Sequence, residues 1–135
     1  NCACADIYAE NEPIADLLVS DMSFISLTKV LPNLKTLLNP NFHEMILLIK
    51  PQFEAGKEKV EKGGVVRDKK VHQEVIQNVI NCAKDLGYKI NDLTYSAIKG
   101  PSGNIEYLIW ISTQQGEEFE FNIETVVNTA FEVLN

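Results

Sequence analysis

Three charged residues in this 135-residue chain stand at the ends of apolar segments. Asp21 ends one such segment, Lys50 directly follows the apolar run Met45–Ile49, and Glu106 lies near the start of a third segment. Because ligands of open α/β sheets bind at the carboxyl ends of parallel strands, we expect Asp21 and Lys50 to meet at that edge. An antiparallel final strand would bring Glu106 to the same edge. The three residues are therefore the candidate catalytic cluster.

The chemistry of such a cluster depends on the charge of Lys50. Two neighbouring carboxylates favour its protonated ammonium form, whereas burial has the opposite effect. A protonated Lys50 suits an orienting or electrostatic role, and a general base at neutral pH would require a second nearby cation. No further lysine is expected at a strand end, so the cluster is one member short. The alternatives are a solvated strand end or a buried ion-pair network with a structural role.

The pattern of apolar residues predicts an α/β fold with a mostly parallel sheet and an antiparallel strand near the C-terminus. The run Met45–Ile49 predicts a strand that is buried on both faces, and Pro51 should end it. The predicted order is a strand at 15–21, a helix at 27–38, a strand at 45–50, a helix at 69–86, a strand at 88–98 with a break at 91–92, a strand at 105–111 and a helix at 123–134.

Local signals predict how the helices begin and end. Ser26, Asp68 and Asn122 are expected N-caps, and Gly87 is expected directly after the second long helix. Pro32 is expected in the first turn of its helix, where proline is tolerated.

Two further features near the candidate cluster admit more than one interpretation. His72 lies on a predicted helix, where a lone histidine is usually structural. The charged segment 54–64, which ends in Gly63 and Gly64, is either a solvated loop or a mobile lid over the site.

The composition narrows the function classes. A net charge of −7 makes this chain a poor nucleic-acid binder by itself, so a polyanionic substrate would need a local basic patch or another domain. No apolar run approaches the roughly 20 residues of a membrane-spanning helix, and no signal peptide is recognisable. The three cysteines, Cys2, Cys4 and Cys82, indicate neither a disulfide framework nor a metal site, and a cytoplasmic location is expected.

Four motifs in this order resemble the TlyA/haemolysin A family, whose members carry an FtsJ-like ribose methyltransferase domain. The resemblance runs from about Asp16 to Trp110 and implies a partial Rossmann-like methyltransferase fold. It also implies 2′-O-methylation of ribosomal RNA with S-adenosylmethionine as the cofactor. The motifs are Asp21–Leu27, Leu48–Gly56, Gly63–Asp68 with His72, and Gly100–Glu106.

The resemblance also implies roles for the charged cluster. Members of the family carry a Lys-Asp-Lys-Glu tetrad, and Asp21, Lys50 and Glu106 match its last three members. In that reading Lys50 helps to deprotonate the ribose 2′-hydroxyl, while Asp21 and Glu106 hold it in place.

The sequence departs from the family pattern in several ways. The first lysine of the tetrad, the glycine-rich cofactor loop and the small RNA-binding domain have no counterpart in it, so no cofactor-binding residue is identified. We therefore expect residues 1–15 to be a leader or a remnant of an upstream region, and residues 16–135 to be the C-terminal part of the methyltransferase domain. We also expect the chain alone to be inactive and to bind cofactor weakly.

Further interpretations concern two partners and two alternative functions. The complete protein is expected to bind ribosomal RNA, and an exposed apolar edge at the strand ending in Asp21 would favour a homodimer. The alternatives to a methyltransferase are a catalytically inactive α/β interaction module and a haemolysin-like membrane-active protein. No long apolar segment or basic amphipathic helix supports the membrane-active alternative.

Overall fold

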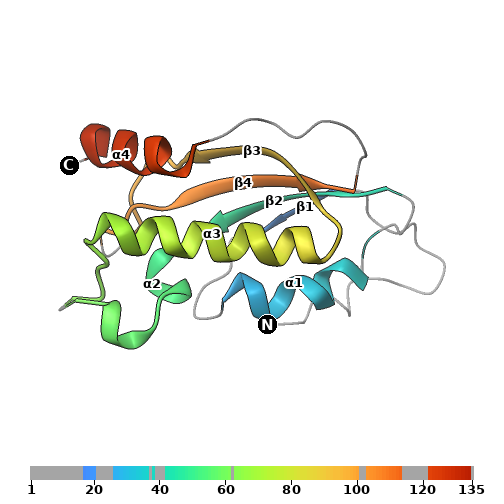
Figure 1. Ribbon diagram of the computed structural model, residues 1–135, viewed down its shortest axis with the longest axis horizontal. Coiled ribbons are helices and arrows are strands. Elements are labelled where there is room, and N and C mark those ends of the chain that lie inside the picture. Colours follow the sequence, from blue (N-terminus) through green and yellow to red (C-terminus); the bar gives the residue numbers. More distant parts are fainter. Residues whose placement is uncertain are drawn as a thin grey trace.

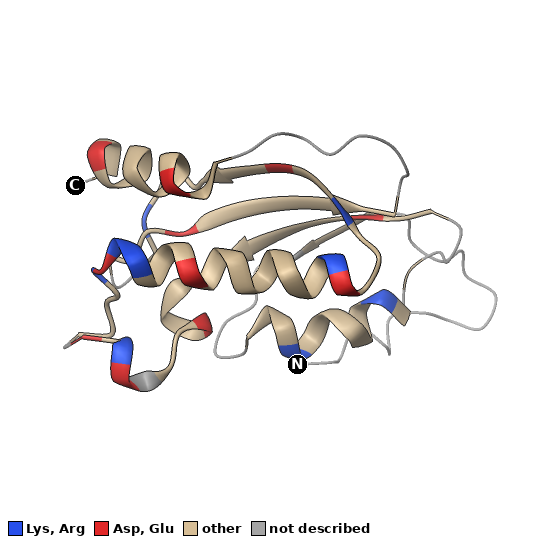
Figure 2. Cartoon of the chain, viewed as in Figure 1, with Lys and Arg blue, Asp and Glu red and all other residues tan. Residues whose placement is uncertain are grey.

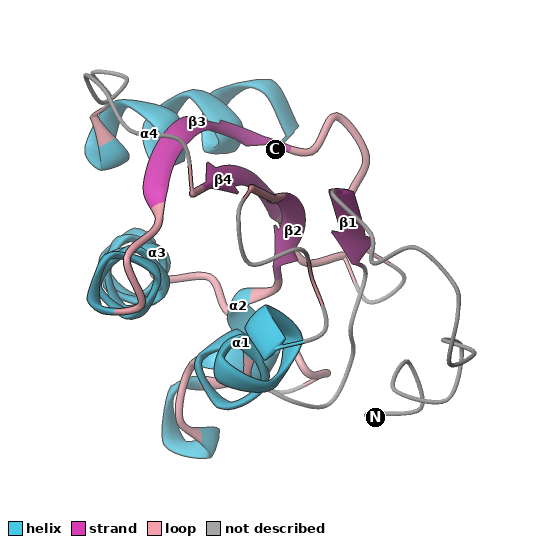
Figure 3. Cartoon of the chain, turned by 90° about the vertical axis from the view of Figure 1, so that its right-hand side faces the viewer, coloured by secondary structure: helices cyan, strands magenta, loops and turns pink. Residues whose placement is uncertain are grey.

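The computed structural model of the chain describes residues 17–20, 26–36, 38, 42–61, 63–100, 103–113 and 122–134. Within these ranges four strands form one sheet in the order β1-β2-β4-β3 (Figure 1). Helices α1 and α3 pack against the sheet, and α4 lies beside α3 along β3 (Figure 3). The elements are β1 (Leu17–Ser20), α1 (Leu27–Thr36), β2 (Glu44–Ile49), α2 (Pro51–Glu54), η2 (Lys57–Lys59), α3 (Lys69–Asp85), β3 (Lys89–Tyr95), β4 (Tyr107–Ser112) and α4 (Ile123–Leu134).

The strand directions confirm the predicted α/β fold. Strands β1 and β2 pair in parallel, whereas β4 pairs antiparallel with both β2 and β3. Strands β1, β2 and β3 therefore run in one direction, and β4 is the antiparallel strand near the C-terminus. The register shift between Ile90 and Asp92 in β3 coincides with the break predicted at 91–92.

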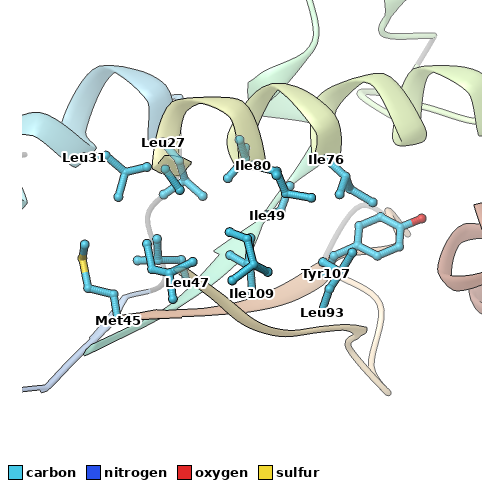
Figure 4. Packing of buried hydrophobic residues seen from close by; sticks show 14 of the residues in the cluster. Leu27, Leu31, Met45, Leu47, Ile49, Ile76, Ile80, Leu93, Tyr107 and Ile109 are labelled. Carbon is cyan, nitrogen blue, oxygen red and sulfur yellow. The ribbon is translucent and has the colours of Figure 1, made fainter. Parts of the chain in front are cut away.

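The prediction that Met45–Ile49 is buried on both faces is wrong. Met45, Leu47 and Ile49 are fully buried, but Ile46 and Leu48, which point to the other face, are only partly buried. The reason is that the helices pack on the first face, where Figure 4 shows the side chains of β2 and β4 pointing toward α1 and α3. An unbroken apolar run can therefore form a strand whose side chains alternate between a buried face and a partly exposed face.

The cap predictions are confirmed. The side chains of Ser26, Asp68 and Asn122 each accept a hydrogen bond from a backbone N–H in the following helix, at 3.2, 2.9 and 3.1 Å. Gly87 follows α3 with φ of 91°, a left-handed conformation that costs glycine little. These ends fix where each helix meets the sheet.

Pro32 lies slightly later than expected, in the second turn of α1. Proline has no N–H, so the carbonyl oxygen of Thr28 loses its usual partner within the helix. The thiol of Cys82, on α3, donates to this oxygen across 3.8 Å. Packing against α3 thus gives the Thr28 carbonyl oxygen a new partner in place of the hydrogen bond that Pro32 cannot make.

Candidate active site at one rim of the sheet

Lys50 is held at the carboxyl end of β2 by the turn that follows it. Its backbone is extended, with φ of −112° and ψ of 102°, and Pro51 is the first residue of α2. The Lys50 carbonyl accepts hydrogen bonds from the N–H groups of Phe53 and Glu54, at 2.9 and 3.2 Å. Lys50 is only 9% exposed. We call the edge of the sheet where β2 ends and β4 begins the site rim.

Glu106 reaches the site rim because β4 runs antiparallel to β2. Ile49, the last residue of β2, pairs with Tyr107, the first residue of β4. Lys50 and Glu106 are the next residues outward on each strand, so they lie beside each other, and Glu106 is 6% exposed. The strand register thus gives two of the three predicted residues neighbouring backbone positions at this rim. Asp21 lies outside the described residues, and the catalytic roles of all three stay predictions.

Two residues enclose the Glu106 carboxylate. Neither of them was given an individual role in the predictions from the sequence. The side-chain amide nitrogen of Gln52 lies 3.4 Å from Glu106 Oε2. Gly100 packs so closely that a Cβ atom built on it would lie 2.6 Å from the same oxygen. The dense turn motif around Gly100 was visible in the sequence, but its contact with Glu106 was not.

The segment 64–66 is fastened to the approach to β4 by a buried asparagine. The side chain of Asn104 accepts a hydrogen bond from the Val66 N–H at 2.9 Å and donates one to the Gly64 carbonyl at 2.8 Å. Asn104 is 1% exposed and stands two residues before Glu106. The backbone that carries Glu106 is therefore tied to the loop between η2 and α3.

His72 makes a second tie to the same loop. Its Nε2 lies 2.7 Å from the Val66 carbonyl oxygen, which can only accept, so Nε2 carries the proton and donates. Its Nδ1 then accepts from the Tyr107 hydroxyl, also at 2.7 Å. Burial is the main cause that lowers the pKa of His72 and favours this neutral form. The expected structural role of His72 is confirmed.

The charged loop before α3 is anchored as well. Lys59 forms an ion pair with Glu74 of α3 at 3.0 Å, and the Glu61 N–H donates to the Val65 carbonyl at 2.8 Å. Gly63 lies between Glu61 and Val65 and has φ of 89°, which turns the chain there. These contacts join the described part of the loop to itself and to α3, and the lid interpretation stays a prediction.

The described residues do not provide a recognisable cofactor or metal site. Of their glycines with positive φ, none lies in a turn that leads from a strand into a helix, the usual position of a glycine-rich phosphate or cofactor loop. Within the same residues there is no group of three or more His, Cys, Asp or Glu side chains that could hold a metal ion. We therefore assign none of the described residues to S-adenosylmethionine.

Comparison with known proteins gives the family. Residues 4–113 match the family described as FtsJ-like methyltransferase. The chain is 44% identical over 119 residues to the protein named "Putative rRNA methyltransferase YqxC" of Bacillus subtilis, covering 84% of this chain and 42% of that protein. It is 42% identical over 99 residues to "16S/23S rRNA (cytidine-2′-O)-methyltransferase TlyA" of Mycobacterium tuberculosis, covering 73% of this chain and 37% of that protein.

A solved structure supports the same relationship. The protein described as "a putative hemolysin from Lactococcus lactis" superimposes with a TM-score of 0.80 at 41% identity, over 93% of this chain and 59% of that chain. The present chain spans about two fifths of the length of the curated relatives it matches. It belongs to the FtsJ-like methyltransferase family, together with proteins of the TlyA and haemolysin A type.

Proposed function

We propose that this chain supplies Asp21, Lys50 and Glu106 to the active site of an S-adenosylmethionine-dependent 2′-O-methyltransferase of ribosomal RNA. The observation that supports the proposal is the pairing of Ile49 with Tyr107, from which neighbouring backbone positions of Lys50 and Glu106 at the site rim follow. The substrate class comes from relatives that are named as ribosomal RNA methyltransferases.

The proposed roles follow from the chemistry of a ribose 2′-hydroxyl, which is a poor nucleophile until its proton is removed. Lys50 binds this hydroxyl and, together with the second cation that a general base requires, helps to withdraw its proton, a task that requires hydrogen-bond contact. Glu106 orients the Lys50 side chain, and Asp21 does so from the neighbouring strand. Both described members are largely shielded from water, which strengthens their electrostatic interactions.

The distribution of charge supports an approach of RNA from the site rim. The chain is acidic overall, and Figure 2 shows acidic and basic residues interspersed along it. Exposed basic residues nevertheless gather where α3 begins, namely Arg67, Lys69 and Lys70, with the exposed Asp68 among them. His72 contacts Tyr107 close to this point, so the cluster lies next to the site rim. A local cluster of this kind can contact phosphates in a protein of negative net charge.

The test is the substitution Lys50→Met in the full gene product that carries this sequence. Transfer of labelled methyl groups to ribosomal RNA should fall about 100-fold or more, the usual size of a lost proton-transfer group. The matched control is Lys29→Met, which removes an exposed lysine from α1 and should leave the rate unchanged. Equal rates for the Lys50→Met variant and the unmodified protein would refute the proposal.

A second candidate function, an interaction module that forms homodimers, has one observation in its favour. Leu17 and Val19 of β1 are 52% and 68% exposed, and within the described sheet β1 pairs only with β2. An exposed apolar strand edge can pair with a second chain. Light scattering at high concentration should then give the mass of a dimer, and a monomer would exclude this candidate.

In the described ranges no helix has the length and apolarity needed to cross a membrane.

A further inference from the structure

Gly100 makes room for the Glu106 carboxylate. Its N–H donates to the Asn104 carbonyl and its carbonyl accepts from the Gly103 N–H, both at 2.9 Å, which closes a tight turn. A Cβ atom at Gly100 would lie 2.6 Å from Glu106 Oε2 and 3.2 Å from its carboxyl carbon. Gly100 does not have a positive φ, so its backbone would accept another residue. The close approach of Glu106 is therefore what requires glycine here.

Gln52 contacts the same carboxylate oxygen from α2, the short helix that directly follows β2. It follows Lys50 by two residues in the turn that begins α2. Its Nε2 donates to Glu106 Oε2 at 3.4 Å, because a carboxylate can only accept. Gln52 thus links the turn that positions Lys50 to the strand that carries Glu106.

The other half of the Gln52 amide is unused. Its Oε1 is buried and accepts no hydrogen bond in the part of the chain that the structure describes. Native proteins leave few buried acceptors unpaired, because the loss of hydration is not repaid. A glutamine that served only to stabilise the fold would be expected to use both ends of its amide. The unpaired oxygen lies two residues from Lys50, and because it has almost no accessible surface, the groups that cover it must shift before a donor on the substrate can reach it.

We propose that Gln52 and Gly100 are positioning residues for Glu106, and that Gln52 Oε1 accepts a hydrogen bond from a hydroxyl or N–H group of the bound nucleotide. This inference rests on the proposed function for its substrate. The positioning of Glu106 by Gln52 and Gly100 is a separate physical claim and can be tested without activity.

The experiment uses the full gene product and two substitutions, each with a matched control. Gly100→Ala inserts a methyl group against the Glu106 carboxylate. Its control is Gly56→Ala, whose methyl group would meet the carboxylate of exposed Glu58 at 2.4 Å, a similar clash with a different glutamate.

Gln52→Leu removes both ends of the amide at nearly constant volume. Its control is Gln77→Leu on the exposed side of α3, where the glutamine contacts Asn81. Circular dichroism confirms that each variant folds, and Gln52→Leu keeps the test valid if Gly100→Ala does not.

The first readout does not depend on activity. In protein labelled with ¹³C at the glutamate carboxyl carbon, the Glu106 signal is identified by its loss in Glu106→Gln. We expect Gly100→Ala and Gln52→Leu to shift this signal at neutral pH, and the two controls to leave it in place. An unmoved Glu106 signal in both test variants would overturn the positioning claim.

The second readout separates kcat from KM for RNA. Gly100→Ala should lower kcat about tenfold with little change in KM, since small displacements of reacting groups have effects of at least this size. Gln52→Leu should also raise KM about fivefold, the value of one lost hydrogen bond. An unchanged KM would overturn the substrate contact. An inactive unmodified protein whose Glu106 signal still moves in the variants would refute the methyltransferase proposal and support the positioning claim.

Discussion

The two rims of the sheet contain a similar motif and use it differently. At the site rim, His72 and Tyr107 pack edge to face with ring centres 5.6 Å apart and share a hydrogen bond. At the opposite rim, where β2 and β3 begin, His43 and Tyr88 do the same at 5.3 Å. All four side chains are buried. The two pairs therefore make equivalent local contributions, and the difference lies in what surrounds them.

At the opposite rim the neighbouring polar groups close the ends of strands. The His43 N–H donates to the Thr113 hydroxyl, and the Thr113 N–H donates to the His43 carbonyl, both at 3.1 Å. These groups join the start of β2 to the end of β4. The groups in these two hydrogen bonds are neutral, so burying them in pairs carries little electrostatic penalty. Charged groups also lie at this rim, because Lys35 Nζ is 5.7 Å from the centre of the Tyr88 ring and Glu44 accepts from the Trp110 indole. Both of these charged residues are only partly buried.

At the site rim the neighbours are charged. Lys50 and Glu106 are both less than a tenth exposed, and Gln52 beside them has an unpaired acceptor. Burying charged side chains costs free energy through desolvation, so these two residues are weak evidence for stability. The contrast agrees with the proposal that the site rim retains charged groups for their chemistry, while the opposite rim stabilises the sheet.

The largest expected effect comes from removing the charge of one glutamate at each rim. Glu106→Gln removes a charge at the site rim with almost no change in shape, and Glu44→Gln makes the same change at the opposite rim, where Glu44 accepts from the Trp110 indole. Methyl transfer by the full gene product should fall about 100-fold for Glu106→Gln and hardly at all for Glu44→Gln. Similar losses in both variants would mean that the two rims do not differ in function.

The next effect concerns stability. His72→Leu leaves the Val66 carbonyl and the Tyr107 hydroxyl buried without their partner. The free energy of unfolding, measured by urea denaturation, should fall by about 2–3 kcal/mol for two such groups. A loss below about 0.5 kcal/mol, the range of ordinary surface changes, would show that the loop does not depend on His72.

Removing one hydroxyl at each rim sharpens the comparison. Tyr107→Phe and Tyr88→Phe each delete a phenol that bonds a buried histidine, so each should cost about 1 kcal/mol of stability. Only Tyr107 adjoins Glu106, so only its variant should also slow methyl transfer. Burial raises the pKa of Tyr88 to about 12, so its hydroxyl remains a donor throughout the pH range of the assay. Equal rates in the two variants would argue against coupling between His72 and the site.

The sequence allowed the framework of the site to be predicted, because that framework depends on local signals. The charged residue after Ile49, the proline that follows it and the unbroken succession of the last two strands were enough to place Lys50 and Glu106 on one rim. The caps at Ser26, Asp68 and Asn122 were predictable for the same reason, since each acts within its own first turn.

The remaining features depend on contacts between distant segments. The face of β2 that remains partly open follows from where the helices pack, which an unbroken apolar run does not reveal. The site of Pro32 became tolerable through Cys82 on another helix. Likewise, Gln52 and Gly100 have meaning only once β4 lies beside β2. Asp21 lies outside the described residues, so its predicted place in the cluster is not tested.

The smallest expected effect is the response of the site rim to acid. Burial lowers the pKa of His72 below its ordinary value of 6.5, so the unfolded chain takes up this proton before the folded chain does. Protonation therefore favours the unfolded state, and the contribution of His72 to stability is lost as the pH falls through about 6.5. Glu54 gives the opposite slope at lower pH, because burial raises its pKa and lets the folded chain keep a proton.

The comparison of the protein with its His72→Gln variant separates these contributions, because Glu54 titrates in both. Urea midpoints measured at about pH 7.5 and about pH 5.5 should fall more on acidification in the unmodified protein than in the variant. The neighbours of His72 include Asp68, whose charge acts against the effect of burial and limits the difference. An equal change in both proteins would mean that His72 takes up its proton as easily in the folded chain as in the unfolded one. The neutral form of His72 that links the Val66 carbonyl to the Tyr107 hydroxyl would then be incorrect.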